Sequence, residues 1–193
     1  MTSVHLLHAG YAGDRVASSV VLVRDGDALI VVDPGMVARR SLILDPLREL
    51  GIGPEAVTHV FLSHHHPDHT MNVALFPEAE VFDYWARYKD DLWLDHDGDG
   101  TKLGSRSTMW LTPGHTPEDA TLVVEADDAV YAMTHLWWRE DRTPEMDPIG
   151  DQAFIEPNRA RVLAAADIVI PGHGGPFRVE RERAVSARGS RGC

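Results

Sequence analysis

The sequence predicts an α/β fold with two sheets and helices on their outer faces. Its 193 residues, 44% of them hydrophobic, are enough for one domain with a sizeable core. A strand–turn–strand pattern comes early in the chain, and strand and helix patterns alternate after it. No repeat, low-complexity run or linker divides the chain, so we expect a single domain over residues 1–193.

The first third of the chain gives signals for a hairpin, a helix and a strand. Val20–Val23 and Ala28–Val32 are apolar runs separated by the turn-forming residues 25–27, which predicts a β-hairpin. Apolar residues at helical spacing predict a helix over 42–50. The apolar run at 57–63 predicts the next strand.

The remaining elements are predicted from shorter patterns. Thr70 is a suitable N-cap for a short helix that ends at Phe76, before Pro77. The segment 79–85 suggests a strand that enters a helix. Strands are then expected at 106–111, 120–125 and 129–133, a helix within 156–166, and a last strand in 167–174.

Composition narrows the class of protein. The net charge of −12, from 18 basic and 30 acidic residues, opposes nucleic-acid binding at long range without excluding a local basic groove. No apolar run approaches the ~20 residues that span a bilayer, and no signal-peptide pattern opens the chain. We therefore expect a soluble, cytoplasmic protein. The single cysteine, Cys193, allows no disulfide framework, so any metal has to be held by histidine and carboxylate.

A cluster of possible metal ligands follows the strand at 57–63. It reads His64-x-His66-x-Asp68-His69. If the backbone is extended there, His64 and His66 project to the same side and can reach one ion. Asp68 and His69 follow the turn at Pro67 and can reach a second ion, whereas His65 is expected to point away.

Three further histidines follow apolar runs elsewhere in the chain: His115, His135 and His173. Ligands in α/β folds gather at the ends of strands. A single histidine after a strand would be weak evidence for a metal site. Four strand ends that each deliver a histidine predict a metal centre.

These motifs resemble those of the metallo-β-lactamase superfamily. The resemblance covers about residues 4–177 and leaves 178–193 as a C-terminal tail. Two stretches, 71–85 and 166–179, are similar to a small stand-alone branch, the metallo-β-lactamase domain-containing protein 1-like proteins. The resemblance implies an αββα sandwich of two mixed sheets with helices on the outer faces. It also implies a dinuclear site.

The resemblance assigns roles to individual residues. His64, His66 and His115 would bind the first metal, and Asp68, His69 and His173 the second. A metal-bound hydroxide would hydrolyse an ester, thioester, lactone or phosphodiester, with Asp68 orienting the nucleophile or taking its proton. Zinc is the expected metal, with iron or manganese as alternatives. Asp33 would hydrogen-bond a ligand imidazole from behind.

The chain departs from the family pattern at one position. Most members have Gly-Asp where this chain has Thr134-His135, and that aspartate bridges both metals. A neutral imidazole cannot bridge two ions in the same way, so His135 is expected to bind one ion, most simply the second, or to swing out. The loaded site then keeps one more positive charge, which predicts weaker binding of the second ion.

Alternative functions stay open. A His-rich site also suits a di-iron oxidoreductase, and the lost bridging aspartate would suit a pseudoenzyme or binding module. A nuclease would need basic residues near the site, for which Arg139, Arg142 and Arg178 are candidates. The expected partner is a small-molecule substrate, and several tryptophans make a homodimer plausible.

Overall fold

The computed structural model describes residues 1–180, which fold into two stacked sheets and a small hairpin. The first sheet contains β1 (Thr2–His8), β4 (Val20–Asp25), β5 (Ala28–Val32), β6 (His59–Phe61), β7 (Glu80–Phe82), β8 (Arg87–Lys89) and β9 (Leu92–Leu94), paired in that order. The second contains β10 (Ser107–Leu111), β11 (Ala120–Glu125), β12 (Val130–Thr134), β13 (Ile168–Pro171) and β14 (Phe177–Arg178), also in that order. Both sheets mix parallel and antiparallel pairs.

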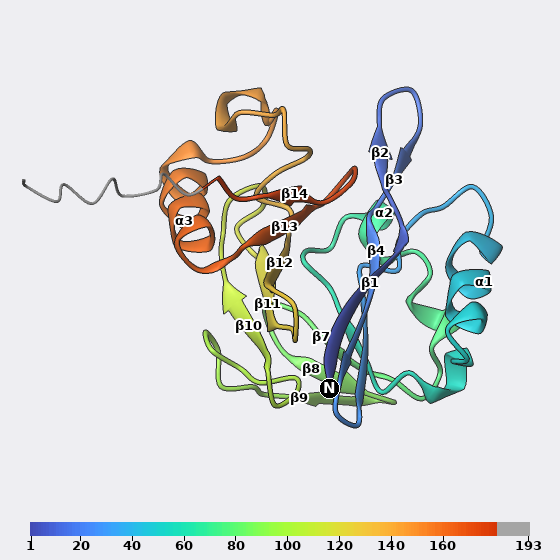
Figure 1. Ribbon diagram of the computed structural model, residues 1–193. Helices are drawn as coiled ribbons and strands as arrows, with labels where there is room; N and C mark the ends of the chain where they lie inside the picture. Colours follow the sequence, from blue (N-terminus) through green and yellow to red (C-terminus); the bar gives the residue numbers. More distant parts are fainter. Residues whose placement is uncertain (181–193) are drawn as a thin grey trace, which may run out of the picture.

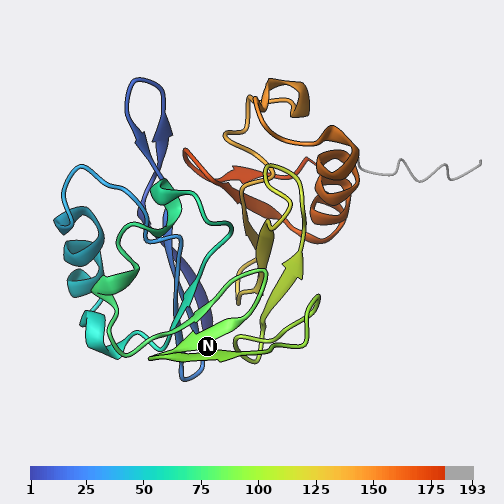
Figure 2. The same cartoon turned by 180° about the vertical axis from the view of Figure 1, so that it is seen from behind.

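Helices cover the outer faces of both sheets. Figures 1 and 2 show α1 (Ser41–Glu49) outside the first sheet and α3 (Gln152–Ala165) outside the second. The predicted αββα sandwich is therefore confirmed. No helix within residues 1–180 has both the length and the apolar character needed to cross a bilayer.

The core consists of three apolar layers. Val21 and Val23 of β4 point into the layer between the two sheets, while Val20 and Leu22 of the same strand point to the layer under α1. A third layer lies between α3 and the outer face of the second sheet. Because β4 is covered on both faces, it is apolar throughout its first four residues instead of alternating with polar ones.

The sheet topology brings several strand ends to one edge. β5, β6 and β7 pair in parallel, and so do β12 and β13. β10 runs in the same direction as β12, since each is antiparallel to β11. The segments after β5, β6, β10, β12 and β13 therefore leave the sandwich where carboxyl ends of parallel strands meet, the usual place for ligands in α/β folds.

A hairpin and a long loop rise at the same end of the sandwich. The glycine-containing segment after β1 forms a two-stranded hairpin of β2 (Tyr11–Ala12) and β3 (Val16–Ala17). Figure 1 shows this hairpin and the orange segment between β12 and α3, which holds the 3₁₀ turn η3 (Pro144–Met146), projecting on the same side.

The prediction of a helix from Thr70 to Phe76 is wrong. The helical turn α2 (Pro67–Thr70) begins earlier, and a 3₁₀ turn, η2 (Val73–Leu75), follows it. Proline suits the first position of a helix because it has no N–H to lose there. Thr70 ends α2 instead of capping the next helix, and its hydroxyl donates to the carbonyl of His66 at 3.3 Å.

The segment 79–85 also does not enter a helix. The chain turns back after β7, because the carboxylate of Asp83 accepts hydrogen bonds from the N–H groups of Trp85 and Ala86 at 2.8 and 2.9 Å. Aspartate commonly stabilises turns in this way. β8 and β9 then extend the sheet by two antiparallel strands. The predicted tail 178–193 begins within β14, and Cys193 lies outside the described residues.

Candidate metal centre

The edge where the strand ends meet carries all seven residues that the sequence singled out as metal ligands. Four of them lie just after β6, and the others follow β10, β12 and β13. The structure brings them together in three overlapping groups, in which the possible ligand atoms lie within 4.8 Å of one another.

The first group consists of His64, His66 and His115. The Nδ1 atom of His66 lies 3.0 Å from Nε2 of His64 and 3.2 Å from Nε2 of His115. His64 and His115 are buried. Three imidazole nitrogens from two distant parts of the chain thus face one point.

The second group consists of Asp68, His69 and His173. The Oδ2 atom of Asp68 lies 3.5 Å from Nε2 of each histidine. Both rings are fully buried, whereas the Asp68 side chain keeps 18% of its surface exposed. Asp68 is therefore the group in this set that a molecule from solution can reach.

His135 lies between these two groups. It forms the third group with His64 of the first and His69 of the second. Its Nε2 atom is 3.2 Å from Nε2 of His173, and it is 1% exposed. The ring packs against Gly172, where an added Cβ would lie 2.2 Å from His135 Cδ2. The imidazole is thus held inside the cluster and is not turned out of it.

Oxygen acceptors behind the cluster fix the orientation of three rings. Asp33 Oδ2 lies 2.8 Å from Nδ1 of His69, and Ser63 donates to both oxygens of this aspartate. Nδ1 of His173 donates to the carbonyl of Ala17 at 2.9 Å. A proton on Nδ1 leaves the Nε2 lone pair directed into the cluster, as metal-binding histidines require.

Asp147 fixes the third ring and was not anticipated from the sequence. Its Oδ2 atom lies 2.8 Å from Nδ1 of His115 and accepts a hydrogen bond from Trp138 Nε1 at 3.0 Å. Its Oδ1 atom accepts from the N–H groups of Ile149 and Gly150 at 3.1 and 2.8 Å. The sequence Asp147-Pro148 predicts a turn, but nothing in it indicates which histidine the carboxylate would meet.

His65 stays outside the cluster. Its Nε2 atom lies 2.8 Å from the buried carboxylate of Asp83, and its side chain is 39% exposed. The alternation along the 64–66 segment therefore separates the two clustered rings from the outward one, as expected for extended backbone.

The donor set fits divalent metal ions. Nε2 of His69 and Nδ1 of His135 are buried without a hydrogen-bond partner among the described residues, and nitrogens of neighbouring rings approach to 3.0–3.2 Å. Buried nitrogens without a partner, and lone pairs that face one another, cost free energy in a protein interior unless a bound cation accepts the lone pairs. Burial, together with neighbouring imidazoles, lowers the pKa of His64 and His135 well below the usual range. Burial likewise lowers the pKa of His173 to about 4. The rings are therefore neutral, the state that binds metal.

Comparison with known sequences assigns a family. Residues 13–188 match the model of the metallo-beta-lactamase superfamily. Metallo-beta-lactamase domain-containing protein 1 of Xenopus laevis is 32% identical, over 92% of this chain and 82% of its own length. The Mus musculus protein of that name is 37% identical, but this chain spans only 64% of it. Hydroxyacylglutathione hydrolase of Tolumonas auensis is 34% identical over 54% of this chain and 42% of its own length.

Solved structures share the fold at low sequence identity. A metallo-beta-lactamase-type protein of Thermotoga maritima has a TM-score of 0.72 at 20% identity, covering 92% of this chain and 99% of its own. A protein in a di-iron-bound form has a TM-score of 0.67 at 20% identity, covering 89% and 94%. An N-acyl homoserine lactone lactonase has a TM-score of 0.65 at 14% identity, covering 89% and 91%.

Proposed function

Because the chain belongs to the metallo-beta-lactamase superfamily, as its histidine motif predicted, we propose that it is a metal-dependent hydrolase of a small ester, thioester or lactone. The observation that carries this proposal is the pair of three-ligand groups joined by His135 at one edge of the sandwich. Relatives named as hydroxyacylglutathione hydrolase and as homoserine lactone lactonase support hydrolysis of acyl compounds.

The residues of the cluster would bind two metal ions. His64, His66 and His115 would hold one divalent ion, and Asp68, His69 and His173 a second, with His135 reaching whichever ion lies nearer. Divalent ions held there would supply Lewis acidity toward a carbonyl oxygen and make water a nucleophile near neutral pH. We propose zinc because imidazole and carboxylate suit it.

Asp68 is the residue we assign to proton transfer. It is the only carboxylate in the three groups, and it lines a hollow of about 320 Å³ together with His66, His115 and His173. A carboxylate at the boundary between buried histidines and this hollow can orient an attacking water and accept its proton. Replacement of Asp68 by asparagine keeps the shape but removes both the base and the anionic ligand of the second ion.

Paired variants of neighbouring histidines test the proposal. Protein purified without chelator or nickel is expected to contain about two zinc ions per chain and to hydrolyse members of a panel of esters, thioesters and lactones. His64→Gln should lose about one of the two zinc ions and the activity, whereas His65→Gln, one residue away and outside the cluster, should keep both ions and the activity. Retention of two ions by His64→Gln, or absence of metal from the wild-type protein after zinc addition, would contradict the proposal.

A di-iron oxidoreductase is the second candidate. The nitrogen-rich cluster and the fold shared with a protein in a di-iron-bound form favour it. Iron in both sites of the purified protein, with visible absorption and oxygen consumption, would support this candidate over hydrolysis. A bis-aryl phosphodiester in the same panel tests the nuclease alternative.

A further inference from the structure

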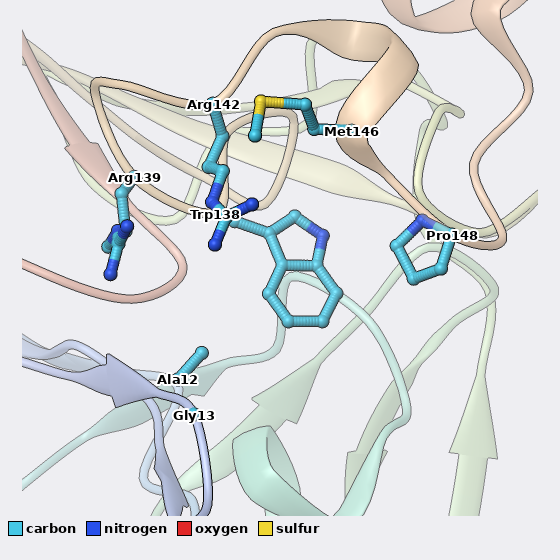
Figure 3. Close-up of a pocket in the computed structure, with 7 residues that line it drawn as sticks. All are labelled: Ala12, Gly13, Trp138, Arg139, Arg142, Met146 and Pro148. Atoms are coloured by element: carbon cyan, nitrogen blue, oxygen red, sulfur yellow. The ribbon is translucent and has the colours of Figure 1, made fainter.

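A second hollow lies beside the metal centre. It has a volume of about 320 Å³, and Trp138 and Pro148 line both it and the hollow over the cluster. A molecule that reaches from one hollow to the other therefore passes along the indole of Trp138. Figure 3 shows this ring at the centre of the second hollow, with Pro148 at one side.

The position of Trp138 is fixed by the metal-centre residues. Its Nε1 donates to Asp147 Oδ2, the same oxygen that lies 2.8 Å from His115 Nδ1. Its ring also meets those of His115, His135 and His173, at centroid distances of 5.2–5.4 Å. The shared wall is thus a rigid apolar surface that begins at the candidate ligands.

The charged residues that line the second hollow are both arginines. Arg139 and Arg142 come from the loop after β12, while Ala12 and Gly13 of the β2–β3 hairpin close the opposite side. Figure 3 shows both arginine side chains extending from the loop toward that hairpin. No carboxylate lines this hollow, although the chain carries a net charge of −12.

Arg142 is the arginine that is available for a ligand. Both terminal oxygens of Asp141 accept hydrogen bonds from Arg139 at 3.0 Å, so Arg139 is already paired. The guanidinium of Arg142 makes no hydrogen bond and no close ion pair within the described residues, although its charge acts on the exposed carboxylate of Asp141, which Arg139 already holds. By contrast Arg48 and Arg87, which also line hollows, are each paired with a carboxylate at 2.7 Å.

We propose that this hollow binds the anionic end, a carboxylate or a phosphate, of a substrate whose scissile acyl bond lies at the metal centre, with Arg142 as the residue that recognises the charge. This inference rests on the proposed function. A guanidinium matches both anions because its N–H groups pair with two oxygens at once. The apolar wall formed by Trp138 and Pro148 suits the uncharged chain between the anion and the acyl group. The substrates would be acidic acyl esters or thioesters.

Matched substrates test the charge preference. Acyl thioesters of increasing chain length, ending in a carboxylate, a phosphonate or a neutral carboxamide, differ mainly in the end group. At the best length, zinc-loaded wild-type protein is expected to have a kcat/KM about 10- to 100-fold higher for an anionic end, the range of a charge-assisted hydrogen bond. The carboxylate and phosphonate arms identify which anion fits better.

Two substitutions separate recognition from general effects of charge. Arg142→Gln should bring the ratio of kcat/KM for the anionic substrate over the carboxamide substrate to within about twofold of one. Arg48→Gln, which removes the same charge on α1, should keep the preference. An anionic preference that survives Arg142→Gln, or equal rates for charged and neutral ends at every length, would overturn the proposal.

Binding of inert analogues separates this inference from the proposed hydrolysis. Thioethers that replace the thioester can be titrated calorimetrically into zinc-loaded protein. If wild type hydrolyses no ester, thioester or lactone, yet binds the anionic thioether and loses this binding in Arg142→Gln, the anion site stands and the hydrolase proposal fails. Binding that is the same in wild type and Arg142→Gln would overturn the anion site whatever the activity.

Discussion

Asp147→Asn is expected to weaken the first metal site without removing a ligand. The four hydrogen bonds at this side chain all come from N–H donors or ring nitrogens: His115 and Trp138 on one oxygen, and the Ile149 and Gly150 backbone on the other. A carboxylate can accept all four. An asparagine cannot, because either orientation of its amide places NH₂ against two of these groups.

The size of the effect follows from the two hydrogen bonds that are lost with one acceptor oxygen. The Asp147 side chain is 4% exposed, so water cannot replace them. Each buried donor left without an acceptor costs about 1–3 kcal/mol, and relaxation of the loop brings the total to about 2–4 kcal/mol of unfolding free energy. If the amide instead donates to His115 Nδ1, the ring has to protonate Nε2, the atom that faces His66. Loss of such a supporting partner typically lowers metal affinity about 10- to 100-fold.

Zinc competition against a chromogenic chelator, together with urea unfolding of the metal-free protein, measures both effects. Asp45→Asn is the matched control, because Asp45 is an exposed aspartate paired with Arg48 on α1. A variant that is destabilised but binds zinc within twofold of wild type would refute the view that Asp147 orients His115.

Three further perturbations test other parts of the structure. His135→Asp places a carboxylate between the two ligand groups, so zinc titration should show the second ion binding at least about tenfold more tightly; unchanged affinity would contradict the charge argument. Gly172→Ala forces a Cβ against the buried His135 ring, so thermal unfolding should show that the free energy of unfolding falls by about 1–3 kcal/mol. The double variant Gly172→Ala/His135→Asp should recover part of that loss, because the smaller side chain relieves the contact. Burial alone would raise the pKa of Asp25, but hydrogen bonds from four donors lower it below its ordinary value. Its stabilising contribution is therefore full above the unfolded pKa of about 3.9 and is lost as pH falls through the folded value. The stability gap between wild type and Asp25→Asn in urea titrations should accordingly be about 1–3 kcal/mol at pH 7 and shrink below about pH 4.

The long apolar elements could be predicted from sequence because their signals are local. The 20–32 hairpin, the 120–125 strand and the helix near 42–50 all occur within a residue or two of their expected bounds. The short elements could not. α2 depends on Pro67, and the turn into β8 depends on a side-chain acceptor at Asp83. Both are contacts that periodicity does not encode.

The residues that form the cluster could be predicted from the sequence, and their binding of metal stays a prediction; the residues that support the cluster could not be predicted. A histidine after an apolar run is visible in the sequence, so His115, His135 and His173 could be found one by one. Asp147 could not, because it lies 32 residues after His115 in an irregular loop. The position of His135 between the groups likewise depends on its packing against Gly172, which only the three-dimensional structure reveals.

The anchoring of His173 has a consequence for the kinetics of folding. Its ring is oriented by the carbonyl of Ala17, 156 residues earlier in the chain, and His115 meets His66 across 49 residues. Closing chain loops this long costs conformational entropy, so we expect these contacts to form late in folding. Metal would then be captured by a nearly finished protein, so added zinc should slow unfolding far more than it speeds refolding. On the ribosome, the complete set of ligands would exist only once β13 has been made, and until then the 64–69 segment would carry its histidines without their partners.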